Sequence, residues 1–288
     1  MTHSPLASPS ATLAVLKRHG LATKKALGQH FLIDDNAVGR IIELAALSGD
    51  ETVLEVGPGI GTLTAALCEH AGAIVAVERD ADLLPVLAET TAHCPRFALL
   101  RADAVQVASE EIAAPFGPPV ALVANLPYAV AATVVLRFFQ ELPSLQSATV
   151  MVQSEVADRM AASPGSKAYG AYTVKLRLIA EPAGRFQVAR GCFLPPPRVD
   201  SAVLRLERNP MPGSPQGLTD AARVADAAFA QRRKTVRNSL RSALGVDGAV
   251  LDVALTSAGI DGGVRAETLP PDRFVALADA LRSAGVLE

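Results

Sequence analysis

Cysteine is scarce in this sequence: only Cys68, Cys94 and Cys192 occur in 288 residues. They lie far apart along the chain and form no C-x-x-C pair, the spacing typical of zinc and redox motifs. We therefore expect no disulfide and no metal site. Cysteine usage of this kind is typical of a protein from a reducing compartment.

The sequence also lacks a membrane-spanning segment and a strong net charge. Its most apolar stretch, residues 118–136, is interrupted by Asn125 and Pro127, and a strand, a turn and a helix explain it better than a transmembrane helix. Residues 1–16 have neither the basic start nor the long apolar run of a secretory signal peptide. The formal net charge of −2 means that a nucleic-acid partner would have to use local basic patches. We expect a soluble, cytoplasmic protein.

The most informative stretch is residues 51–64, where Gly57, Gly59 and Gly61 follow a β-branched and apolar run. The run 52–56 is typical of a buried strand, and a helical pattern begins directly after the last glycine. Strand, glycine turn and helix form the first half of a βαβ unit, in which bare backbone and a helix N-terminus meet the ligand. The spacing is G-x-G-x-G, whereas dinucleotide-binding proteins have G-x-G-x-x-G. An NAD-dependent oxidoreductase is therefore the least favoured enzyme class.

Polar side chains end the strands that follow. Glu78 ends the predicted strand 73–78, Asp103 follows the strand that begins at Phe97, and Asn125 follows the strand that begins at Val120. Ligands of open α/β sheets bind at the carboxyl edge of the strands, so these side chains are expected to share one site. The predicted fold class is α/β, with a Rossmann-like sheet and a small all-helical C-terminal domain.

Composition divides the chain into four parts. Residues 1–12, rich in Ser, Pro and Ala, are expected to be disordered, and residues 13–208 carry the alternating strands and helices. The Pro- and Gly-rich residues 209–217 are predicted to be a linker. Residues 218–288 show helical patterns only.

Two basic segments are candidates for RNA contacts. Within a predicted helix over residues 220–244, Arg233, Arg237 and Arg241 recur every four positions, beside Lys234. No acidic residue occurs between positions 226 and 247. A basic helix face is usually only solvated, but an unbalanced one in a net-acidic chain favours contacts with phosphates. Lys24 and Lys25 form a second basic segment.

Five short sequence motifs, called words below, follow one another along the chain. They are Gly28-Gln-His-Phe-Leu32, Glu55-Val-Gly-Pro-Gly-Ile-Gly61, Asn125-Leu-Pro-Tyr128, Gln153-Ser-Glu-Val-Ala-Asp-Arg159 and Phe193-Leu-Pro-Pro-Pro-Arg-Val-Asp-Ser201. Together they resemble the ribosomal RNA adenine N6-dimethyltransferase family, and most closely its bacterial small-subunit branch. The glycine word is shared by many methyltransferases. The words Asn125-Leu-Pro-Tyr128 and Phe193-Leu-Pro-Pro-Pro197, at this separation, are much more specific. Leu194, where an aromatic residue is common, and Arg198, where lysine is common, are small departures.

The resemblance implies transfer of methyl groups from S-adenosylmethionine to adenosine N6, twice on each of two adjacent adenosines near the 3′ end of 16S rRNA. It assigns the ribose hydroxyls to Glu78 and the adenine amine to Asp103. The remaining cofactor contacts fall to Gly57 at the methionine end and to Gly59, His30, Leu32 and Asn125.

The resemblance also implies catalytic roles. The Asn125 side-chain oxygen and the Leu126 carbonyl would accept hydrogen bonds from N6, and Tyr128 and Phe193 would stack on the two faces of a base flipped out of the RNA. The implied partner is small-subunit rRNA in the 30S subunit or its precursor, bound by a monomer that needs neither a metal nor a membrane.

Two other functions remain open beside the oxidoreductase. One is the erythromycin-resistance type of dimethyltransferase, which acts on large-subunit rRNA and shares the catalytic layout. The other is a non-enzymatic assembly factor or organellar transcription relative, disfavoured by the intact Asn125–Tyr128 word and the cofactor acids.

Overall fold

A computed structural model describes residues 2–22 and 29–287. Lys24 and Lys25 lie outside the described residues, so their predicted RNA contacts stay a prediction. Two compact units divide the chain. The first comprises residues 1–157 and 182–208, and the second residues 158–181 and 209–288.

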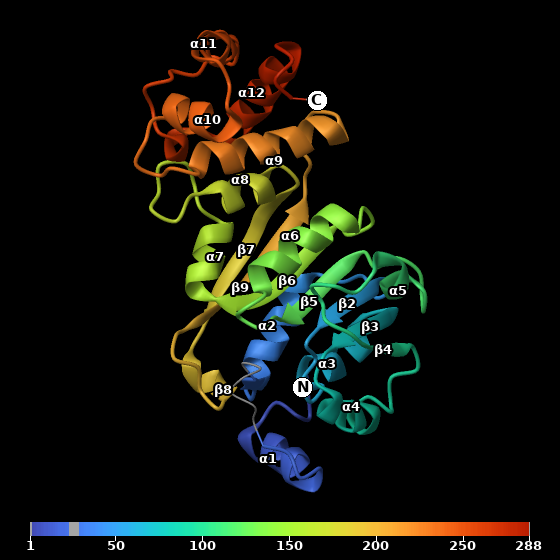
Figure 1. Cartoon of the computed structure of the whole chain (residues 1–288). Coiled ribbons are helices and arrows are strands. Elements are labelled where there is room, and N and C mark those ends of the chain that lie inside the picture. Colours follow the sequence, from blue (N-terminus) through green and yellow to red (C-terminus); the bar gives the residue numbers. More distant parts are fainter. Residues whose placement is uncertain (1, 23–28, 288) are drawn as a thin grey trace. The chain divides into compact units, whose positions relative to one another are not determined.

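The sheet that dominates the first unit has a reversal of strand order at its centre (Figure 1). Seven strands of the described chain follow one another in the order β4, β3, β2, β5, β6, β9 and β7. Their bounds are Phe97–Arg101, Ala73–Glu78, Thr52–Val56, Ala121–Asn125, Ser147–Gln153, Ser201–Arg208 and Ala180–Val188, respectively. Pairing is parallel from β4 to β6, and β9 is antiparallel to β6. The predicted α/β class is confirmed, and the reversal between β2 and β5 is where such sheets bind ligands.

Helices alternate with the strands of the first unit. Among the described residues they are α1 (Pro9–Arg18), α2 (Asp35–Ala45), α3 (Thr62–His70), α4 (Leu84–Thr90), α5 (Ser109–Ala113), α6 (Ala131–Glu141) and α7 (Ser154–Met160), which continues into the second unit. The helix expected directly after the last glycine of the turn is α3. Asp34 caps α2 by accepting a hydrogen bond from the Ala37 amide at 2.8 Å. Val38 and Ile41 of α2 are at most 1% exposed, and each side chain buried in this way contributes about 1.5–3 kcal/mol of transfer free energy.

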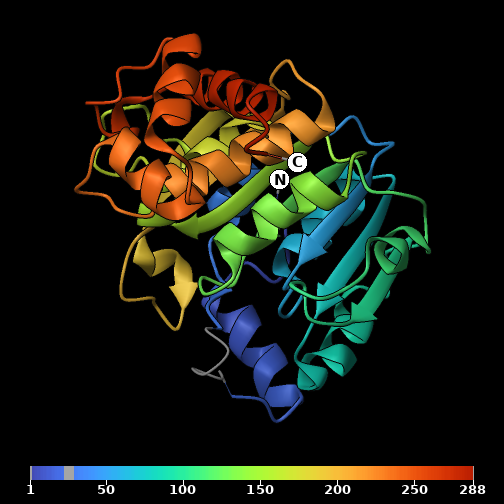
Figure 2. The same cartoon turned by 45° about the horizontal axis from the view of Figure 1, so that its top comes forward.

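Residues 2–12 have a defined conformation in the structure, in contrast to the expected disorder over residues 1–12. Helix α1 spans Pro9–Arg18 and lies beside α4 (Figure 2), with Arg18 2.6 Å from Glu89. Ser8 caps α1, and proline stands at its first position. Ser-Pro composition was therefore misleading here, because the two residues form a helix start rather than a disordered segment.

The second unit is helical, but its boundaries differ from the expected ones. Its helices are α8 (Ala171–Arg177), α9 (Pro215–Phe229), α10 (Val236–Leu244), α11 (Gly248–Ser257) and α12 (Pro271–Ser283). Tyr169 is 1% exposed and donates a hydrogen bond to the Leu269 carbonyl at 2.8 Å, so residues before the expected linker belong to this core. Helix α9 already begins within the predicted linker 209–217.

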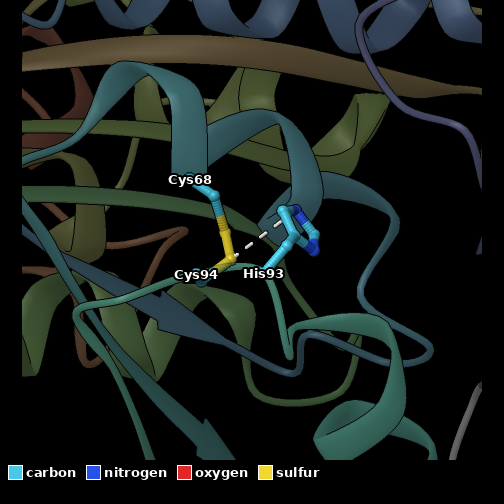
Figure 3. A group of neighbouring side chains, drawn as sticks. All are labelled: Cys68, His93 and Cys94. Carbon is cyan, nitrogen blue, oxygen red and sulfur yellow. Dashed lines mark hydrogen bonds between the residues drawn. A yellow bond between two sulfur atoms is a disulfide. The ribbon is translucent and has the colours of Figure 1, made fainter.

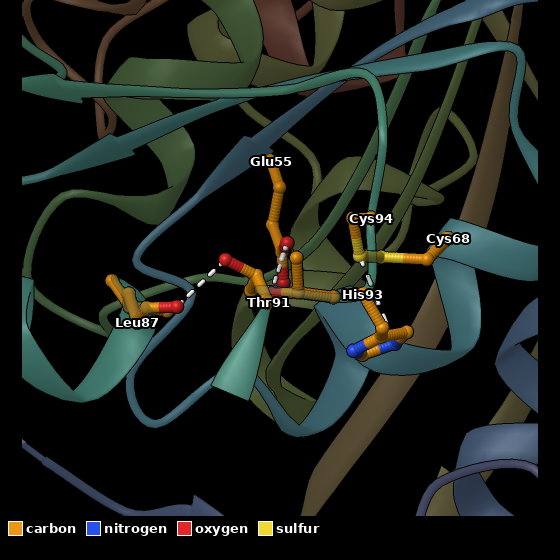
Figure 4. Close-up of a disulfide and its surroundings, with 7 residues drawn as sticks. Glu55, Cys68, Leu87, Thr91, His93 and Cys94 are labelled. Atoms are coloured by element: carbon orange, nitrogen blue, oxygen red, sulfur yellow. Dashed lines mark hydrogen bonds between the residues drawn. A yellow bond between two sulfur atoms is a disulfide. The ribbon is translucent and has the colours of Figure 1, made fainter. Parts of the chain in front are cut away.

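A disulfide joins Cys68 and Cys94, and the expectation of no disulfide was wrong (Figure 4). Cys68 lies in α3 and Cys94 shortly before β4, 26 positions later, with a Cα–Cα distance of 5.5 Å. Spacing along the sequence did not reveal the pair, because folding of the β2–α3–β3–α4–β4 segment brings the two positions together.

No helix among the described residues is long and apolar enough to cross a membrane.

Candidate active site

The glycine turn between β2 and α3 requires residues without a side chain. Gly57 and Gly59 have φ of +67° and +64°, values that L-residues with a Cβ rarely adopt. A Cβ on Gly57 would lie 3.4 Å from Pro127, and one on Gly59 would lie 3.3 Å from the Phe31 ring. The glycines therefore allow two other sequence words to pack directly against the turn.

A cavity of about 460 Å³ opens at this turn, inside the first unit. It is lined by all the predicted cofactor residues and by most of the predicted catalytic residues, namely His30, Leu32, Gly57, Gly59, Glu78, Asp103, Asn125, Leu126 and Tyr128. They come from three of the sequence words and from the ends of β3 and β4, and the parallel strands bring the glycine turn, Glu78, Asp103 and Asn125 to one edge, as predicted. Their individual roles stay predictions.

Carboxylates dominate the polar lining. Glu78 is 7% exposed, and its side chain accepts a hydrogen bond from the Asp80 amide at 2.7 Å and another from the Gly59 backbone. Burial raises the pKa of Glu78 above its ordinary value, although the backbone donors oppose this shift. Asp103 accepts from the Val105 amide at 2.9 Å and lies 3.4 Å from Arg79. These acceptor carboxylates fit a cationic nucleoside such as S-adenosylmethionine, whose ribose hydroxyls and amine donate hydrogen bonds, better than a negatively charged pyrophosphate.

Sequence reasoning missed two polar residues of the cavity wall. Asp80 is 7% exposed and accepts from the Gln29 side chain at 2.7 Å, which ties the N-terminal word to the turn after β3. The available signal was the position of Asp80 two residues beyond a strand end that already carried Glu78.

Glu55 is the second missed acid, although it stood in the glycine word. It is 1% exposed and accepts a hydrogen bond from the Thr64 hydroxyl at 2.7 Å. Burial raises the pKa of Glu55 to about 8; the Thr64 hydrogen bond opposes this shift and the negative charge of Glu78 adds to it. The carboxyl group is therefore largely protonated at neutral pH.

This pKa predicts a pH dependence of stability. The folded-state pKa of Glu55 lies above the ordinary value of 4.5. The contribution of Glu55 to the free energy of unfolding is therefore fully present below pH 4.5 and is lost as the pH rises to about 8. Relative to Glu55→Gln, the wild-type protein should lose up to about 1.4 kcal/mol per pH unit within that window. Denaturant unfolding at a series of pH values measures the difference. Thr64→Val, which removes the opposing hydrogen bond, should extend the upper limit of the window to higher pH and leave its lower limit unchanged; parallel curves for wild type and Glu55→Gln would contradict the assignment.

Asn125 is held in one orientation. Its side-chain Nδ2 donates to the His30 carbonyl at 3.3 Å, and the adjacent Leu126 amide donates to the Met151 carbonyl at 3.0 Å. Asn125 ends β5 and lines the cavity. Because the side-chain nitrogen of Asn125 donates to the His30 carbonyl, the side-chain oxygen of Asn125 is the atom that can accept a hydrogen bond from a ligand.

Tyr128 links three of the sequence words. Its hydroxyl is 2.8 Å from the Ser201 hydroxyl, and its ring stacks near-parallel to His30, with centroids 5.7 Å apart. His30 Nδ1 donates to the Pro195 carbonyl at 2.8 Å, since a carbonyl can only accept. Burial raises the pKa of the Tyr128 phenol, so it stays protonated near neutral pH. Tyr128 is thus suited to stacking and not to acting as a base.

Phe193 is absent from the residues that line the cavity. It is 2% exposed and belongs to the short strand β8 (Phe193–Leu194), which pairs antiparallel with β1 (Phe31–Leu32). It is a member of a buried cluster that also contains Met151 and Val203. In this structure the ring that stacks on Tyr128 is that of His30, and the stacking role of Phe193 stays a prediction.

The predicted basic helix face is smaller than expected. Thr235 caps α10 by accepting from the Asn238 amide, so Arg233 and Lys234 precede this helix. Arg237 is paired with Asp252 of α11, with Nη2 2.8 Å from a carboxylate oxygen. The absence of acidic residues between positions 226 and 247 did not predict this ion pair, because Asp252 comes from the following helix, α11. Arg233, Lys234 and Arg241 are exposed.

Comparisons with known proteins agree with the geometry. A family model described as ribosomal RNA adenine dimethylase matches residues 20–283. A relative from Thermobifida fusca, "Ribosomal RNA small subunit methyltransferase A", is 43% identical over 95% of this chain and 96% of its own length. One of the same name from Shouchella clausii is 39% identical over 96% of each chain.

Among solved structures, the 23S rRNA methyltransferase ErmE is 28% identical, with a TM-score of 0.67 over 88% of this chain and 99% of its own. A dimethyladenosine transferase from Plasmodium falciparum, at 20% identity and a TM-score of 0.72 over 89% of this chain and 98% of its own, shares the fold. The family match and these identities, together with the acidic cavity at the glycine turn, show that the chain belongs to the ribosomal RNA adenine dimethylase family.

Proposed function

We propose that this protein dimethylates N6 of two adjacent adenosines near the 3′ end of small-subunit rRNA, within the 30S subunit or its precursor. It would act as a cytoplasmic monomer without a metal in catalysis. The relatives' names support the small-subunit substrate. The observation that supports the chemistry best is that Asn125 lines the cavity while its side-chain nitrogen donates to the His30 carbonyl.

When bound, S-adenosylmethionine supplies a methyl group on a positively charged sulfur. Adenine N6 is a poor nucleophile, because its lone pair is delocalised into the ring. The Asn125 oxygen and the Leu126 carbonyl would accept the two N6 hydrogens, and both hydrogen bonds would strengthen as N6 becomes tetrahedral and positive. Tyr128 would hold the ring plane, with Ser201 holding the phenol in place. Positioning, and not a strong base, supplies most of the catalysis in this mechanism.

Methyl transfer to purified ribosomal subunits from methylation-deficient cells tests the substrate. We expect dimethyladenosine in 16S rRNA of small subunits and none in large subunits. Labelling of 23S rRNA would favour the activity named for ErmE, which is the specific alternative. Methylation of neither subunit, with cofactor binding intact, would favour a non-enzymatic role.

The second unit is proposed as the RNA-binding part. Alanine at Arg233 and Arg241, two exposed cations, should weaken RNA binding and lower the slope of log K against log salt by about 2, because each lost phosphate contact lowers it by about 1. Arg237→Ala is the matched control and should have a smaller effect, since Asp252 already balances that charge. Filter binding across a salt series measures both. An unchanged slope in the double variant, with cofactor affinity also unchanged, would show that these arginines are only solvated.

A further inference from the structure

A group of three metal-ligating side chains lies outside the proposed active site (Figure 3). Cys68 of α3 and Cys94 form the disulfide, and the His93 ring lies beside them, with Nε2 3.8 Å from the Cys94 sulfur. One ligand atom from each of the three residues lies within 4.8 Å of the other two. None of the three lines the cavity at the glycine turn.

The spacing of these atoms suits a tetrahedral ion. Zinc binds thiolate sulfur at about 2.3 Å and imidazole nitrogen at about 2.0–2.1 Å, so two ligands of one ion are roughly 3.5–3.8 Å apart. The His93 to Cys94 separation of 3.8 Å already matches this value. The largest change would be separation of the two sulfurs, by rotation of the Cys68 side chain near the end of α3 and of the Cys94 side chain in the turn before β4.

The chemistry of the donors narrows the choice of ion. Two thiolates and an imidazole favour borderline or soft cations such as Zn²⁺ over Mg²⁺ or Ca²⁺, which prefer oxygen ligands. Cys68 and Cys94 are partly exposed and His93 is exposed, so both a reductant and an ion can reach the group. Three protein ligands leave the fourth tetrahedral position for water or an added ligand.

We propose that Cys68, His93 and Cys94 form a redox-controlled site for a zinc-type divalent cation. A thiol reductant (2 RSH) converts the disulfide into two cysteine thiols and is itself oxidised to RSSR. Binding of the cation then releases two protons, one from each thiol, and joins the ion to two thiolates and to neutral His93 Nε2. In the reverse exchange a disulfide oxidant (RSSR) takes up two electrons and two protons to give 2 RSH, while the two thiolates reform the sulfur–sulfur bond and release the ion. The two states exclude one another, because both use the same two sulfurs.

Cys68, His93 and Cys94 lie on segments that lead to the cavity at the glycine turn. Figure 4 shows the disulfide close to Thr91 and to buried Glu55, which lines the cavity. Helix α3, which carries Cys68, begins at the glycine turn, and the chain after Cys94 continues into β4 towards Asp103. An ion here would therefore cross-link two segments that support the cavity, as the disulfide does.

Cobalt(II) titration of the full-length protein tests the site, because Co²⁺ bound by thiolates gives charge-transfer and tetrahedral ligand-field absorption. The protein reduced with a phosphine, which is then removed, should bind one Co²⁺ per chain with these bands, and Zn²⁺ should displace it. The oxidised protein should give no bands. Cys68→Ser should abolish the thiolate bands or weaken them strongly, and His93→Gln should weaken binding at least about tenfold, or about 1.4 kcal/mol.

Cys192→Ser is the matched control, because Cys192 is a partly buried thiol outside this group and its loss should leave the titration unchanged. Circular dichroism of each variant separates loss of the site from loss of the fold. The proposal is overturned if the reduced, folded protein shows no thiolate bands, if Cys68→Ser and His93→Gln titrate like wild type, or if only Cys192→Ser loses the bands. A reduced protein that reoxidises in the presence of excess Zn²⁺ as fast as without it also contradicts it.

Discussion

Alanine at Asn125 is expected to lower the single-turnover rate of methyl transfer by roughly 100- to 1000-fold, the usual effect of removing one good transition-state hydrogen bond. The His30 carbonyl already accepts a hydrogen bond from the side-chain nitrogen of Asn125 at 3.3 Å, so the side-chain oxygen would need little reorganisation to accept a hydrogen bond from N6. RNA and cofactor affinities should change far less than the rate, because the hydrogen bond strengthens mainly as N6 becomes positive.

Two successive methyl transfers to the same N6 atom require more of Asn125 than a single transfer would. After the first methylation N6 keeps one hydrogen, and the amine must turn so that this hydrogen meets an acceptor while the lone pair again faces the sulfonium. Asn125 and the Leu126 carbonyl offer both acceptors for the first round and at least one for the second. Tyr128→Ala should therefore also slow transfer, since the ring plane would no longer be held while the amine turns.

The measurement is single turnover at saturating cofactor, with mono- and dimethyladenosine counted by mass spectrometry. Tyr128→Phe is the control: it loses the hydrogen bond to Ser201 but keeps the stacking ring, so its rate should stay much closer to wild type than that of Tyr128→Ala. Near-normal rates for both alanine variants, or a methyl group on an atom other than N6, would refute the catalytic assignment.

Much of the cavity wall at the carboxyl edge of the sheet could be predicted from the sequence, because it depends on local patterns. Glycines mark the turn, and polar residues such as Glu78 and Asn125 mark strand ends that a parallel sheet brings together. The strands were predicted to within a few residues, since apolar β-branched runs such as 52–56 are short and clearly bounded.

The errors share another physical cause, which is contact between residues far apart in sequence. Asp252 balances Arg237 from another helix, and Cys94 meets Cys68 across a βα unit. The burial of Phe193 likewise depends on its pairing with Leu32, far away in sequence, while its stacking role stays a prediction. Periodicity cannot reveal such contacts, because it reports only which face of an element is apolar.

Replacement of Glu78 should weaken cofactor binding more than any other single change in the cavity wall. The buried carboxylate has two oxygens for the two ribose hydroxyls, and hydrogen bonds to a charged group are worth about 1.5–3 kcal/mol, or roughly 10- to 150-fold in Kd. Glu78→Ala carries a complication, because Glu78 also accepts from the Asp80 amide at 2.7 Å and from Gly59, so its loss could disturb the glycine turn. Glu78→Gln keeps the shape and one acceptor oxygen and separates the two effects.

Calorimetry with S-adenosylmethionine and with an analogue that lacks the ribose hydroxyls completes the test. Wild type should bind the natural cofactor more tightly than the analogue by this factor of roughly 10 to 150, whereas Glu78→Gln, with one neutral acceptor oxygen left, should show a much smaller preference. Arg79→Ala is the neighbouring control: the Arg79 side chain is exposed and contacts Asp103 at 3.4 Å, so its loss should leave the preference for ribose hydroxyls intact. If folded Glu78→Gln and Glu78→Ala both bind S-adenosylmethionine as wild type does, Glu78 does not hold the ribose, and the assignment of the whole acidic edge to this cofactor fails with it.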